Sequence, residues 1–582
     1  METIHGSRYT CEIPRVDLLT FVFSSGDAAT RQRPQYFDAD HPERHYSLSQ
    51  GESYAKRVAK GLQDLGLQDD DKVFLYSGNN LFFPILLWGV IGAGCVFTAT
   101  SPSASLEGGY VEARPVVEKH ILTLTELTNQ LRDSDSKLLL ASLDGIETAL
   151  KAATAVGIPQ ERVYVFCDPR DASMIRNATR SEPWTSLWAS EHGNEFEWPT
   201  SADPDYLARK TIILNYSSGT TGPPKGVEIT HANVVANSAQ LIHYRTMVGN
   251  QPSAYARQER LARSGERWLA PLPMYHAYGQ IYYCVNAPRM SAKVYIMSKY
   301  DVRRLLLFVD IYRITFLTAV PTVLIAMAKH PRGVYNLQSL EYALTGSAPL
   351  GHDIASVIEK HFLRPGLELK NGWGLTETTN SISGFCPDDQ NDGRSVGYLN
   401  PNCAGKIVPV EGQSWDSEVP PATLVGEIWV SGQNVMKGYY KNPEATADTV
   451  VVQNGRRWLR TGDIGYFEDG RIYIIDRLKE LIKVKGLQVS PSELEAAILL
   501  HEGVADVAVT GAKLEMGECP RAFVVRKDPE LQEEQIHDLI RSRFSKHKWL
   551  TGGVYFIDEI PKTPSGKTKR RLLPIPPKTA KL

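Results

Sequence analysis

The residues with the clearest chemical meaning form one loop, residues 216–227, which reads Tyr-Ser-Ser-Gly-Thr-Thr-Gly-Pro-Pro-Lys-Gly-Val. Its glycines let backbone N–H groups approach phosphate oxygens, its hydroxyls supply further donors, and its lysine adds a positive charge. A Walker A motif is excluded, because Lys225 is followed by Gly226 instead of Ser or Thr. The plain alternative is a surface turn rich in Gly, Ser and Thr. We expect phosphate contacts from Ser217, Ser218, Gly219, Thr220, Thr221, Gly222 and Lys225.

The elements that would carry this loop belong to a wider pattern of short strands and helices. An apolar strand at residues 211–214 runs directly into the loop. Residues 72–99 show a strand, a helical stretch and a second strand, which is the rhythm of a βαβ unit. Similar apolar runs recur at residues 162–166, 314–320 and 340–344, with helical segments between them. The pattern predicts parallel sheets flanked by helices, as in layered α/β folds.

Toward the C-terminus the sequence changes character twice. Between about residues 384 and 470, short strands separated by Gly, Pro, Asn and Asp predict an antiparallel, β-rich part. A compact α+β module follows, and Ser490, Pro491 and Glu493 at its start have the spacing of a capping box with proline at the first helical position. The expected elements are a helix from about Pro491, strands at residues 504–510 and 521–526, and a helix near Gln535. We therefore expect two domains, residues 1–476 and 477–582.

Composition excludes several classes of function. The chain has 582 residues, of which 42% are hydrophobic and 22% charged, and its formal net charge is −2. These values fit a large soluble globular protein and show no surface for a polyanion, so no nucleic-acid partner is expected. The longest apolar run, residues 82–99, is interrupted by Pro84 and three glycines and falls short of a membrane span. No membrane-spanning segment is therefore expected.

The cysteines and the two termini bear on localisation. Seven cysteines are scattered without a CxxC pair, which argues against a zinc site or a disulfide framework and favours a reducing compartment. Residues 1–8 contain no apolar stretch leading to a cleavage site, so secretion is not expected. The last residues, Ala580, Lys581 and Leu582, are a variant of the Ser-Lys-Leu peroxisomal address. We predict recognition by the peroxisomal import receptor, and a cytoplasmic protein if that signal is not read.

The loop at residues 216–227 resembles the signature of the adenylate-forming superfamily, which contains acyl-CoA synthetases, 4-coumarate-CoA ligases, firefly luciferases and the adenylation domains of peptide synthetases. The resemblance runs in order along nearly the whole chain, from about residue 48 to residue 573. It implies a multi-domain α/β fold with a large N-terminal domain of two α/β sub-domains plus a distorted β-barrel. A small, mobile α+β C-terminal domain would follow, with the active site between the two domains.

One further motif resembles the acid-binding segment of that superfamily. Residues 272–279 read Leu-Pro-Met-Tyr-His-Ala-Tyr-Gly, and the resemblance gives His276 the role of orienting the substrate carboxylate. A lone histidine is more often structural than catalytic, so the surrounding octapeptide carries this prediction. We expect Tyr278, Tyr282 and Thr345 to shape the acid pocket, and both aryl acids and medium-chain fatty acids remain open as substrates.

Two motifs are similar to the segments that surround adenine. Residues 344–350 read Leu-Thr-Gly-Ser-Ala-Pro-Leu, and alone they would pass for an ordinary turn. Residues 371–377, Asn-Gly-Trp-Gly-Leu-Thr-Glu, match the Gly-Tyr-Gly-x-Thr-Glu element, with Trp373 in the place of the usual tyrosine. Tryptophan can still stack on adenine. The nucleotide contacts that these motifs imply are Gly346, Ser347, Ala348, Trp373 and Gly374.

The resemblance also implies contacts to the phosphates and the ribose. Thr376 would hydrogen-bond the α-phosphate, and Glu377 would help to hold Mg²⁺, a hard cation that bridges a carboxylate and phosphate oxygens. A surface glutamate is the alternative for Glu377. Residues 460–463, Arg-Thr-Gly-Asp, resemble the ribose clamp, in which the Asp463 carboxylate accepts from both ribose hydroxyls.

The remaining motifs lie around the small domain. Residues 476–480, Asp-Arg-Leu-Lys-Glu, resemble the linker, with Arg477 near the ribose or phosphate and Lys479 at the hinge; a solvated run of charges is the alternative. The segment that would face the site after a domain rotation contains Lys483, Gly486 and Gln488, with Gln488 also assigned to the nucleotide. Residues 561–567, Pro-Lys-Thr-Pro-Ser-Gly-Lys, are similar to the motif that carries the catalytic lysine of adenylation, here Lys567, although a basic tail is the alternative.

Together these motifs imply an ATP-dependent acid–thiol ligase that uses ATP, Mg²⁺ and coenzyme A. It would convert a small-molecule carboxylic acid to acyl-AMP and pyrophosphate, and then to acyl-CoA. A stand-alone enzyme that loads a carrier protein and a luciferase-like oxidoreductase share the motifs and stay open. A non-catalytic nucleotide-binding protein would be expected to have lost Lys567, Glu377 or Asp463, and all three are present. Residues 426–432 depart from the Gly-Glu-Ile-Cys-Ile-Arg-Gly box of plant coumarate ligases, which argues against coumarate as the acid.

Overall fold

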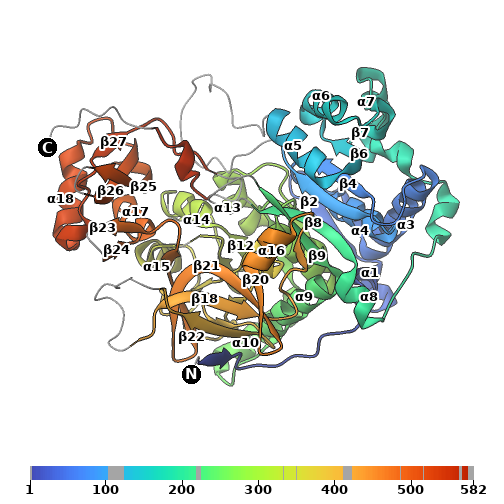
Figure 1. The fold of residues 1–582 in the computed structure, drawn as a ribbon. Helices are drawn as coiled ribbons and strands as arrows, with labels where there is room; N and C mark the ends of the chain where they lie inside the picture. Colours follow the sequence, from blue (N-terminus) through green and yellow to red (C-terminus); the bar gives the residue numbers. More distant parts are fainter. Residues whose placement is uncertain are drawn as a thin grey trace.

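The computed structural model describes residues 3–102, 124–217, 224–331, 333–348, 350–410, 423–484, 487–514, 517–562 and 567–574. Three large sheets and two small ones organise this part of the chain, and helices cover the sheets (Figure 1). The three large sheets belong to a large N-terminal domain with one main apolar core, where Trp88, Trp184 and Trp268 are fully buried. A mixed α/β architecture is confirmed.

Two strands of the first seven-stranded sheet flank the predicted phosphate loop in the sequence. Its strands, in spatial order, are β19 (Gly438–Tyr439), β9 (Lys225–Thr230), β8 (Thr211–Ser217), β5 (Val96–Thr100), β4 (Lys72–Tyr76), β6 (Ser136–Ala141) and β7 (Val163–Val165). The strands from β8 to β7 are parallel, and β9 returns antiparallel to β8. Helices α3 (Leu48–Asp64), α4 (Phe83–Gly92), α5 (Leu124–Ser134) and α6 (Ile146–Val156) accompany it. The predicted βαβ unit is confirmed, and every residue of α4 is buried.

The second seven-stranded sheet brings the motifs that contain His276, Gly346 and Trp373 to one edge. Its order is β14 (Leu369–Asn371), β13 (Tyr342–Thr345), β12 (Phe316–Ala319), β10 (Arg267–Ala270), β11 (Lys293–Ile296), β2 (Pro34–Asp38) and β3 (His45–Ser47), with only β3 antiparallel among the described pairs. The helices nearby are α9 (His231–Thr246), α10 (Pro252–Ser264), α11 (Ala277–Ile281), α13 (Val302–Ile311), α14 (Pro321–Ala328), α15 (His352–His361) and the π-helix η6 (Tyr282–Asn286). Since β10, β12 and β13 are parallel, the segments that follow their carboxyl ends meet, which is where ligands bind in such sheets.

The third large sheet is antiparallel, as predicted for residues 384–470. Its order is β1 (Ile4–Gly6), β17 (Ala404–Val408), β18 (Gly426–Ser431), β21 (Arg456–Glu468), β22 (Arg471–Arg477), β16 (Tyr398–Leu399) and β15 (Ser383–Gly384), and β20 (Val450–Gln453) also pairs with β21. Helix α16 (Pro443–Thr449) precedes β20. Among the described residues the end strands β1 and β15 do not pair with each other, so the expected barrel is an open sheet.

The small C-terminal domain has a core of its own. Its elements are β23 (Ile482–Val484), β24 (Leu487–Val489), α17 (Pro491–Leu499), β25 (Val504–Leu514), β26 (Gly517–Arg526), α18 (Glu533–Arg543) and β27 (Val554–Phe556). Leu494, Val507 and Ile536 belong to its separate apolar cluster. Only half of the predicted capping box forms: Ser490 Oγ accepts the N–H of Glu493, whereas the Glu493 carboxylate accepts from Lys548 Nζ at 2.8 Å. The ion pair replaces the reciprocal backbone bond.

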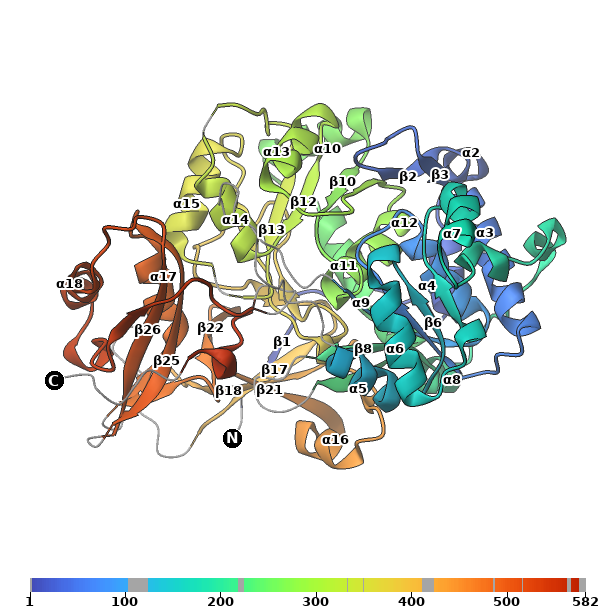
Figure 2. The same cartoon turned by 90° about the horizontal axis from the view of Figure 1, so that it is seen from above.

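The two domains touch through α14. The Lys329 ammonium, just after that helix, donates to the backbone carbonyls of Val504 and Ala505 at 3.2 and 3.1 Å. Figure 2 shows α17 of the small domain beside α15 and α14 of the large one. No helix among the described residues has the length and apolar content to cross a membrane.

Candidate active site

Two neighbouring cavities lie where the predicted motifs meet. The first has a volume of about 510 Å³ and the second about 1080 Å³. Both are lined by His276, Gly346 and Trp373 of the large domain and by Lys567 of the small domain. Residues almost 300 positions apart in the chain, His276 and Lys567, thus share one enclosed space.

Most predicted site residues line these cavities. Around the first cavity are Ser217, Lys225, His276, Tyr278, Tyr282, Thr345, Gly346, Ser347, Trp373, Gly374, Thr376, Glu377, Arg477, Lys479 and Lys567. Ala348 and Asp463 line the second cavity. Ser218, Gly219, Thr220, Thr221, Gly222 and Gly486 lie outside the described residues, as do Ala580, Lys581 and Leu582. Within the predicted phosphate loop, Ser217 and Lys225 are paired across β8 and β9.

Lys483 and Gln488 line neither cavity. They are cross-strand partners in the β23–β24 hairpin of the small domain. Lys483 is exposed and Gln488 is buried within the small domain. In this arrangement of the two domains, therefore, the structure does not bring Gln488 to the predicted nucleotide site.

The Asp463 carboxylate is held by two donors. Trp373 Nε1 donates to Oδ2 at 2.8 Å, and Arg477 Nε lies 3.0 Å from Oδ1. The Asp463 charge raises the pKa of Arg477, and Asp463 itself is 4% exposed. The indole thus does more than offer a ring face: its N–H orients the carboxylate predicted to meet the ribose. A charge-assisted pair of this kind is stronger than a neutral hydrogen bond.

The backbone around Trp373 leaves no room for a side chain at the next position. A Cβ on Gly374 would lie 1.9 Å from the carbonyl oxygen of Asn380. Nearby, Ser347 and Thr379 adopt φ values of 79° and 69°. A positive φ is uncommon for threonine because its branched side chain crowds the backbone. Thr379 is held there by hydrogen bonds from its Oγ1 to the carbonyl of Asn434 and from its N–H to the carbonyl of Thr376. Such strained positions cluster at functional sites.

Glu377 lies in a short 3₁₀ turn, Thr376–Thr378, at the cavity wall. Its Oε1 accepts from the hydroxyl of Tyr439 at 2.8 Å. The Lys225 ammonium lies 4.9 Å from the centre of the Tyr439 ring. The described residues contain no cluster of three or more His, Cys, Asp or Glu side chains able to hold a metal by themselves. One carboxylate in such a place fits a Mg²⁺ whose other ligands are phosphate oxygens and water.

Burial lowers the pKa of both His276 and Lys567. Burial and the Lys567 charge lower the pKa of His276 to about 4, so its imidazole is neutral near pH 7. Burial, together with the Arg477 guanidinium, lowers the pKa of Lys567 to about 8 despite the opposing charges of Asp463 and Glu377. An ammonium in this setting favours a negatively charged ligand.

The inner end of the first cavity was not predicted from the sequence beyond Tyr278, Tyr282 and Thr345. The further lining residues are Leu241, Ile242, Tyr244, Arg245, Trp268, Asn286, Met290, Phe316, Tyr342 and Phe385. They come from α9, the π-helix and the short helical turn after it, the starts of three strands and the segment after β15, and no local motif links them. Tyr439 was missed for the same reason.

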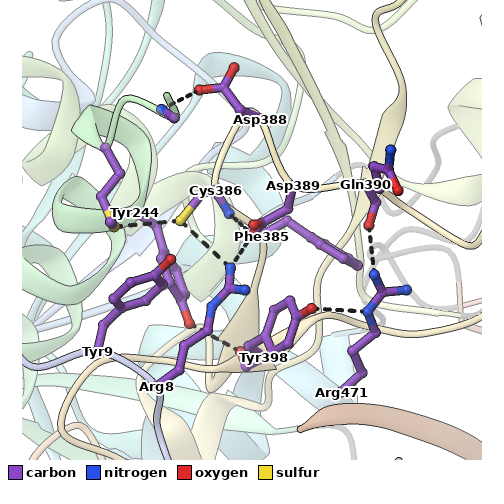
Figure 3. A network of polar contacts seen from close by, with 12 residues as sticks. Arg8, Tyr9, Tyr244, Phe385, Cys386, Asp388, Asp389, Gln390, Tyr398 and Arg471 are labelled. Atoms are coloured by element: carbon purple, nitrogen blue, oxygen red, sulfur yellow. Dashed lines mark hydrogen bonds and ion pairs between the residues drawn. The ribbon is translucent and has the colours of Figure 1, made fainter. Parts of the chain in front are cut away.

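A polar network fixes the base of this inner end (Figure 3). Tyr244 donates its hydroxyl to the carbonyl of Leu399 at 2.6 Å, and Tyr342 donates to the carbonyl of Phe385 at 2.9 Å. From the N-terminal segment, the Arg8 guanidinium pairs with Asp389 and lies 3.6 Å from the centre of the Tyr398 ring. The network holds the aromatic walls in one position.

Comparisons with known proteins agree with this geometry. The model of the AMP-binding enzyme family matches residues 25–440, and that of the AMP-binding enzyme C-terminal domain matches residues 493–567. The chain is 32% identical to the phenylacetyl-CoA ligase epaB of Aspergillus niger, with 97% of each chain covered. It is 31% identical to the peroxisomal OPC-8:0-CoA ligase 1 of Arabidopsis thaliana, with 96% of this chain and 92% of that protein covered. Its fold is similar to that of ATP-bound MatB from Rhodopseudomonas palustris, with a TM-score of 0.75, 24% identity and coverage of 96% and 97%.

Proposed function

The chain belongs to the AMP-binding enzyme family, and on this premise we propose that its site joins a carboxylic acid to coenzyme A in two half-reactions. It is an AMP-forming acyl-CoA ligase. In the first half-reaction the acid attacks the α-phosphorus of ATP, giving acyl-AMP and pyrophosphate. In the second, the thiol of coenzyme A displaces AMP. The observation that carries this proposal is the single cavity that holds His276, Thr376, Glu377 and Lys567.

The residues divide the first half-reaction between them. Neutral His276 orients the acid at the carboxyl edge of the second sheet, while Trp373 and Asp463 hold the adenosine. Lys567 and Lys225 offset the negative charge that develops on the phosphoryl oxygens. Catalysis of this kind consists mainly of positioning and electrostatic stabilisation, and needs no covalent enzyme intermediate.

Glu377 would hold a Mg²⁺ ion through its second carboxylate oxygen, since Oε1 accepts from Tyr439. When bound there, Mg²⁺ supplies positive charge to the triphosphate. Thr376, in the same turn, would donate to the α-phosphate.

The second half-reaction needs another arrangement of the domains. We place the boundary between residues 476 and 477, and assign Lys479 as the hinge. Rotation there would withdraw Lys567 and turn Lys483, Gly486 and Gln488 toward the site. Hinges of this kind use a few backbone positions.

The acid is an aryl or medium-chain fatty acid, which the aromatic inner wall of the first cavity supports. Pyrophosphate release from a panel of carboxylic acids, with and without coenzyme A, tests the function. Acid-dependent pyrophosphate release, followed by acyl-CoA, is expected. A carrier protein as acceptor in place of coenzyme A, or no acid-dependent release at all, would contradict the proposal.

The pH dependence of adenylation should follow Lys567. Because the protonated ammonium is needed and its pKa is about 8, kcat/KM for ATP should fall as the pH rises through about 8. His276, with a pKa of about 4, adds no change between pH 5 and 7. In Lys567→Arg the guanidinium stays protonated, so this fall should disappear even where the rate is lower. The same fall in Lys567→Arg would assign the titration to another group.

We also propose import into the peroxisome through Ala580, Lys581 and Leu582, a proposal supported by the similarity to the peroxisomal ligase of Arabidopsis thaliana. The full chain with a fluorescent protein at its N-terminus should co-localise with a peroxisomal marker. Removal of the last three residues should leave it in the cytosol, and Ala580→Ser should keep import. Peroxisomal import of the truncated chain would refute this address.

A further inference from the structure

One arginine at the inner end of the first cavity has unused hydrogen-bonding groups. Arg245, in the last turn of α9, lines that cavity, and its side chain is 7% exposed. Its Nη2 donates to both carboxylate oxygens of Glu266, at 2.9 and 3.1 Å. Its Nε and Nη1 are buried and have no hydrogen-bond partner among the described residues. Buried guanidinium N–H groups are rarely left unpaired, so an acceptor from a ligand is expected there.

The surroundings favour a neutral acceptor over a second carboxylate. Glu266 already balances the Arg245 charge, and its carboxylate is also held by Trp268 Nε1 at 3.0 Å and Thr315 Oγ1 at 3.1 Å. A ligand carboxylate would add an uncompensated negative charge to a buried site. In addition, Nε and Nη1 do not share an edge of the guanidinium, so they cannot bind one carboxylate in a bidentate manner. A single hydroxyl or carbonyl oxygen matches either nitrogen.

The amide of a second residue favours a hydroxyl over a carbonyl as the polar group of the ligand. Asn286, at the end of the π-helix, lines the same cavity and is 2% exposed. Its Oδ1 is buried and has no hydrogen-bond partner in the described part of the chain. The oxygen and nitrogen of an amide are exchangeable by rotation. A hydroxyl both donates and accepts, and therefore suits Asn286 in either orientation as well as Arg245.

The strands fix how far this group lies from the reacting carboxylate. The Arg245 guanidinium lies 5.2 and 5.1 Å from the ring centres of Phe316 and Tyr342, the first residues of β12 and β13. Thr345, the last residue of β13, lies at the opposite edge, next to Gly346. Three residues at ~3.3 Å each separate the two edges by ~10 Å. This is the span of a medium-chain acid or an aryl-propanoic acid.

We propose that the first cavity selects carboxylic acids that carry a hydroxyl at the end remote from the carboxylate, which Arg245 and Asn286 receive about 10 Å from the reacting carbon. The inference rests on the proposed ligase function and narrows its substrate class. A site built to hydrogen-bond a substrate hydroxyl discriminates strongly against an analogue that lacks it, because its own polar groups are then left unpaired.

Pairs of matched acids test the proposal. In each pair, the second acid has a methyl group in place of the hydroxyl of the first. The pairs are ω-hydroxyoctanoate with nonanoate, and para-hydroxyphenylpropanoate with para-methylphenylpropanoate; together they separate aliphatic from aryl acids. For at least one pair, kcat/KM for pyrophosphate release should favour the hydroxylated acid by about tenfold or more. A ratio at or below unity in both pairs would overturn the proposal.

Two double variants each replace both partners of an ion pair, so that no lone buried charge is left. Arg245→Met with Glu266→Gln should bring the hydroxyl-to-methyl ratio of the preferred pair down to near unity. The control is Arg257→Met with Asp388→Asn, a pair of the same burial that lines neither cavity: side-chain exposures are 7% and 14%, against 7% and 15% for Arg245 and Glu266. It should keep the wild-type ratio even where stability is reduced.

The outcomes distinguish a failure of this inference from a failure of the proposed ligase function. An unchanged ratio in the Arg245 variant overturns the inference. Activity with the methyl acids but no preference for the hydroxylated ones overturns the inference and leaves the ligase function intact. No coenzyme A-dependent turnover with any acid overturns both.

Discussion

Lys567→Ala is expected to form acyl-AMP about 10²- to 10³-fold more slowly than the wild type, because the substitution removes a fixed positive charge from the phosphate site. Burial and Arg477 already lower the pKa of Lys567 to about 8, so a negatively charged phosphate is the partner that restores the ammonium. Pyrophosphate exchange into ATP at a saturating acid concentration measures this half-reaction. Thioester formation from preformed acyl-AMP should stay within about threefold, because domain rotation has by then withdrawn residue 567.

The control for this experiment is Lys513→Ala. Lys513 is an exposed lysine of β25 in the same domain, and it lines neither cavity. Both half-reactions should be unchanged in that variant. We do not expect Lys567→Ala to unfold, since the substitution removes a charge whose burial is unfavourable, and thermal unfolding checks this. Equal losses in both half-reactions would contradict the role proposed for Lys567.

The meeting of the motifs was implied by the family resemblance, and strand positions explain it, although only the strand before Gly346, at residues 340–344, was expected from the sequence pattern. The segments that contain His276 and Gly346 each follow a short apolar strand of the second sheet. The carboxyl ends of parallel strands lie at one edge of a sheet, so the segments that follow these strands converge there regardless of how the strands are connected. The helix from Pro491 was predicted for a local reason too, since Ser490 caps it.

Features that depend on distant residues could not be predicted in this way. Trp373 was expected to offer a flat ring, but its bond to Asp463 joins residues 90 positions apart. Arg245 and Asn286 belong to α9 and a π-helix, and neither stands in a recognisable motif. β25 also runs to Leu514 instead of ending near residue 510, because its pairing with β26 continues to Gly517. The Trp373–Asp463 bond and the position of Arg245 arise from tertiary packing, whereas the extension of β25 is pairing within a local hairpin.

The predictions for Lys483 and Gln488 concern a second arrangement of the domains. In the present one, Lys483 and Gln488 line neither cavity, whereas Lys567 lines both. The contact of Lys329 with the backbone of residues 504 and 505 belongs to this same arrangement. The structure therefore brings together the residues proposed for adenylation, whereas the proposed thioester step requires the other arrangement.

Lys479→Pro is expected to slow thioester formation from preformed acyl-AMP on the order of 10²-fold, while acyl-AMP formation changes little. Residues 477–480 form a turn in which Glu480 N–H donates to the Arg477 carbonyl at 2.9 Å, and Leu478 N–H donates to Gly462 of the large domain at 2.8 Å. Lys479 is exposed, and it directly follows Leu478, which is bonded to the large domain. Proline fixes φ at about −65° and would so restrict the backbone rotation proposed to move the small domain.

Two comparisons separate stiffening of the hinge from other effects of this substitution. Lys479→Ala removes the charge but keeps φ free, so it should leave the thioester step close to wild type. Proline also restricts the residue before it, and damage to the turn itself would appear as a loss of adenylation, which uses the turn as it stands here. Equal losses in both half-reactions, or a normal thioester rate in Lys479→Pro, would show that the domain does not turn about this residue. A selective loss would mean that one backbone position couples the withdrawal of Lys567 to the entry of the thiol.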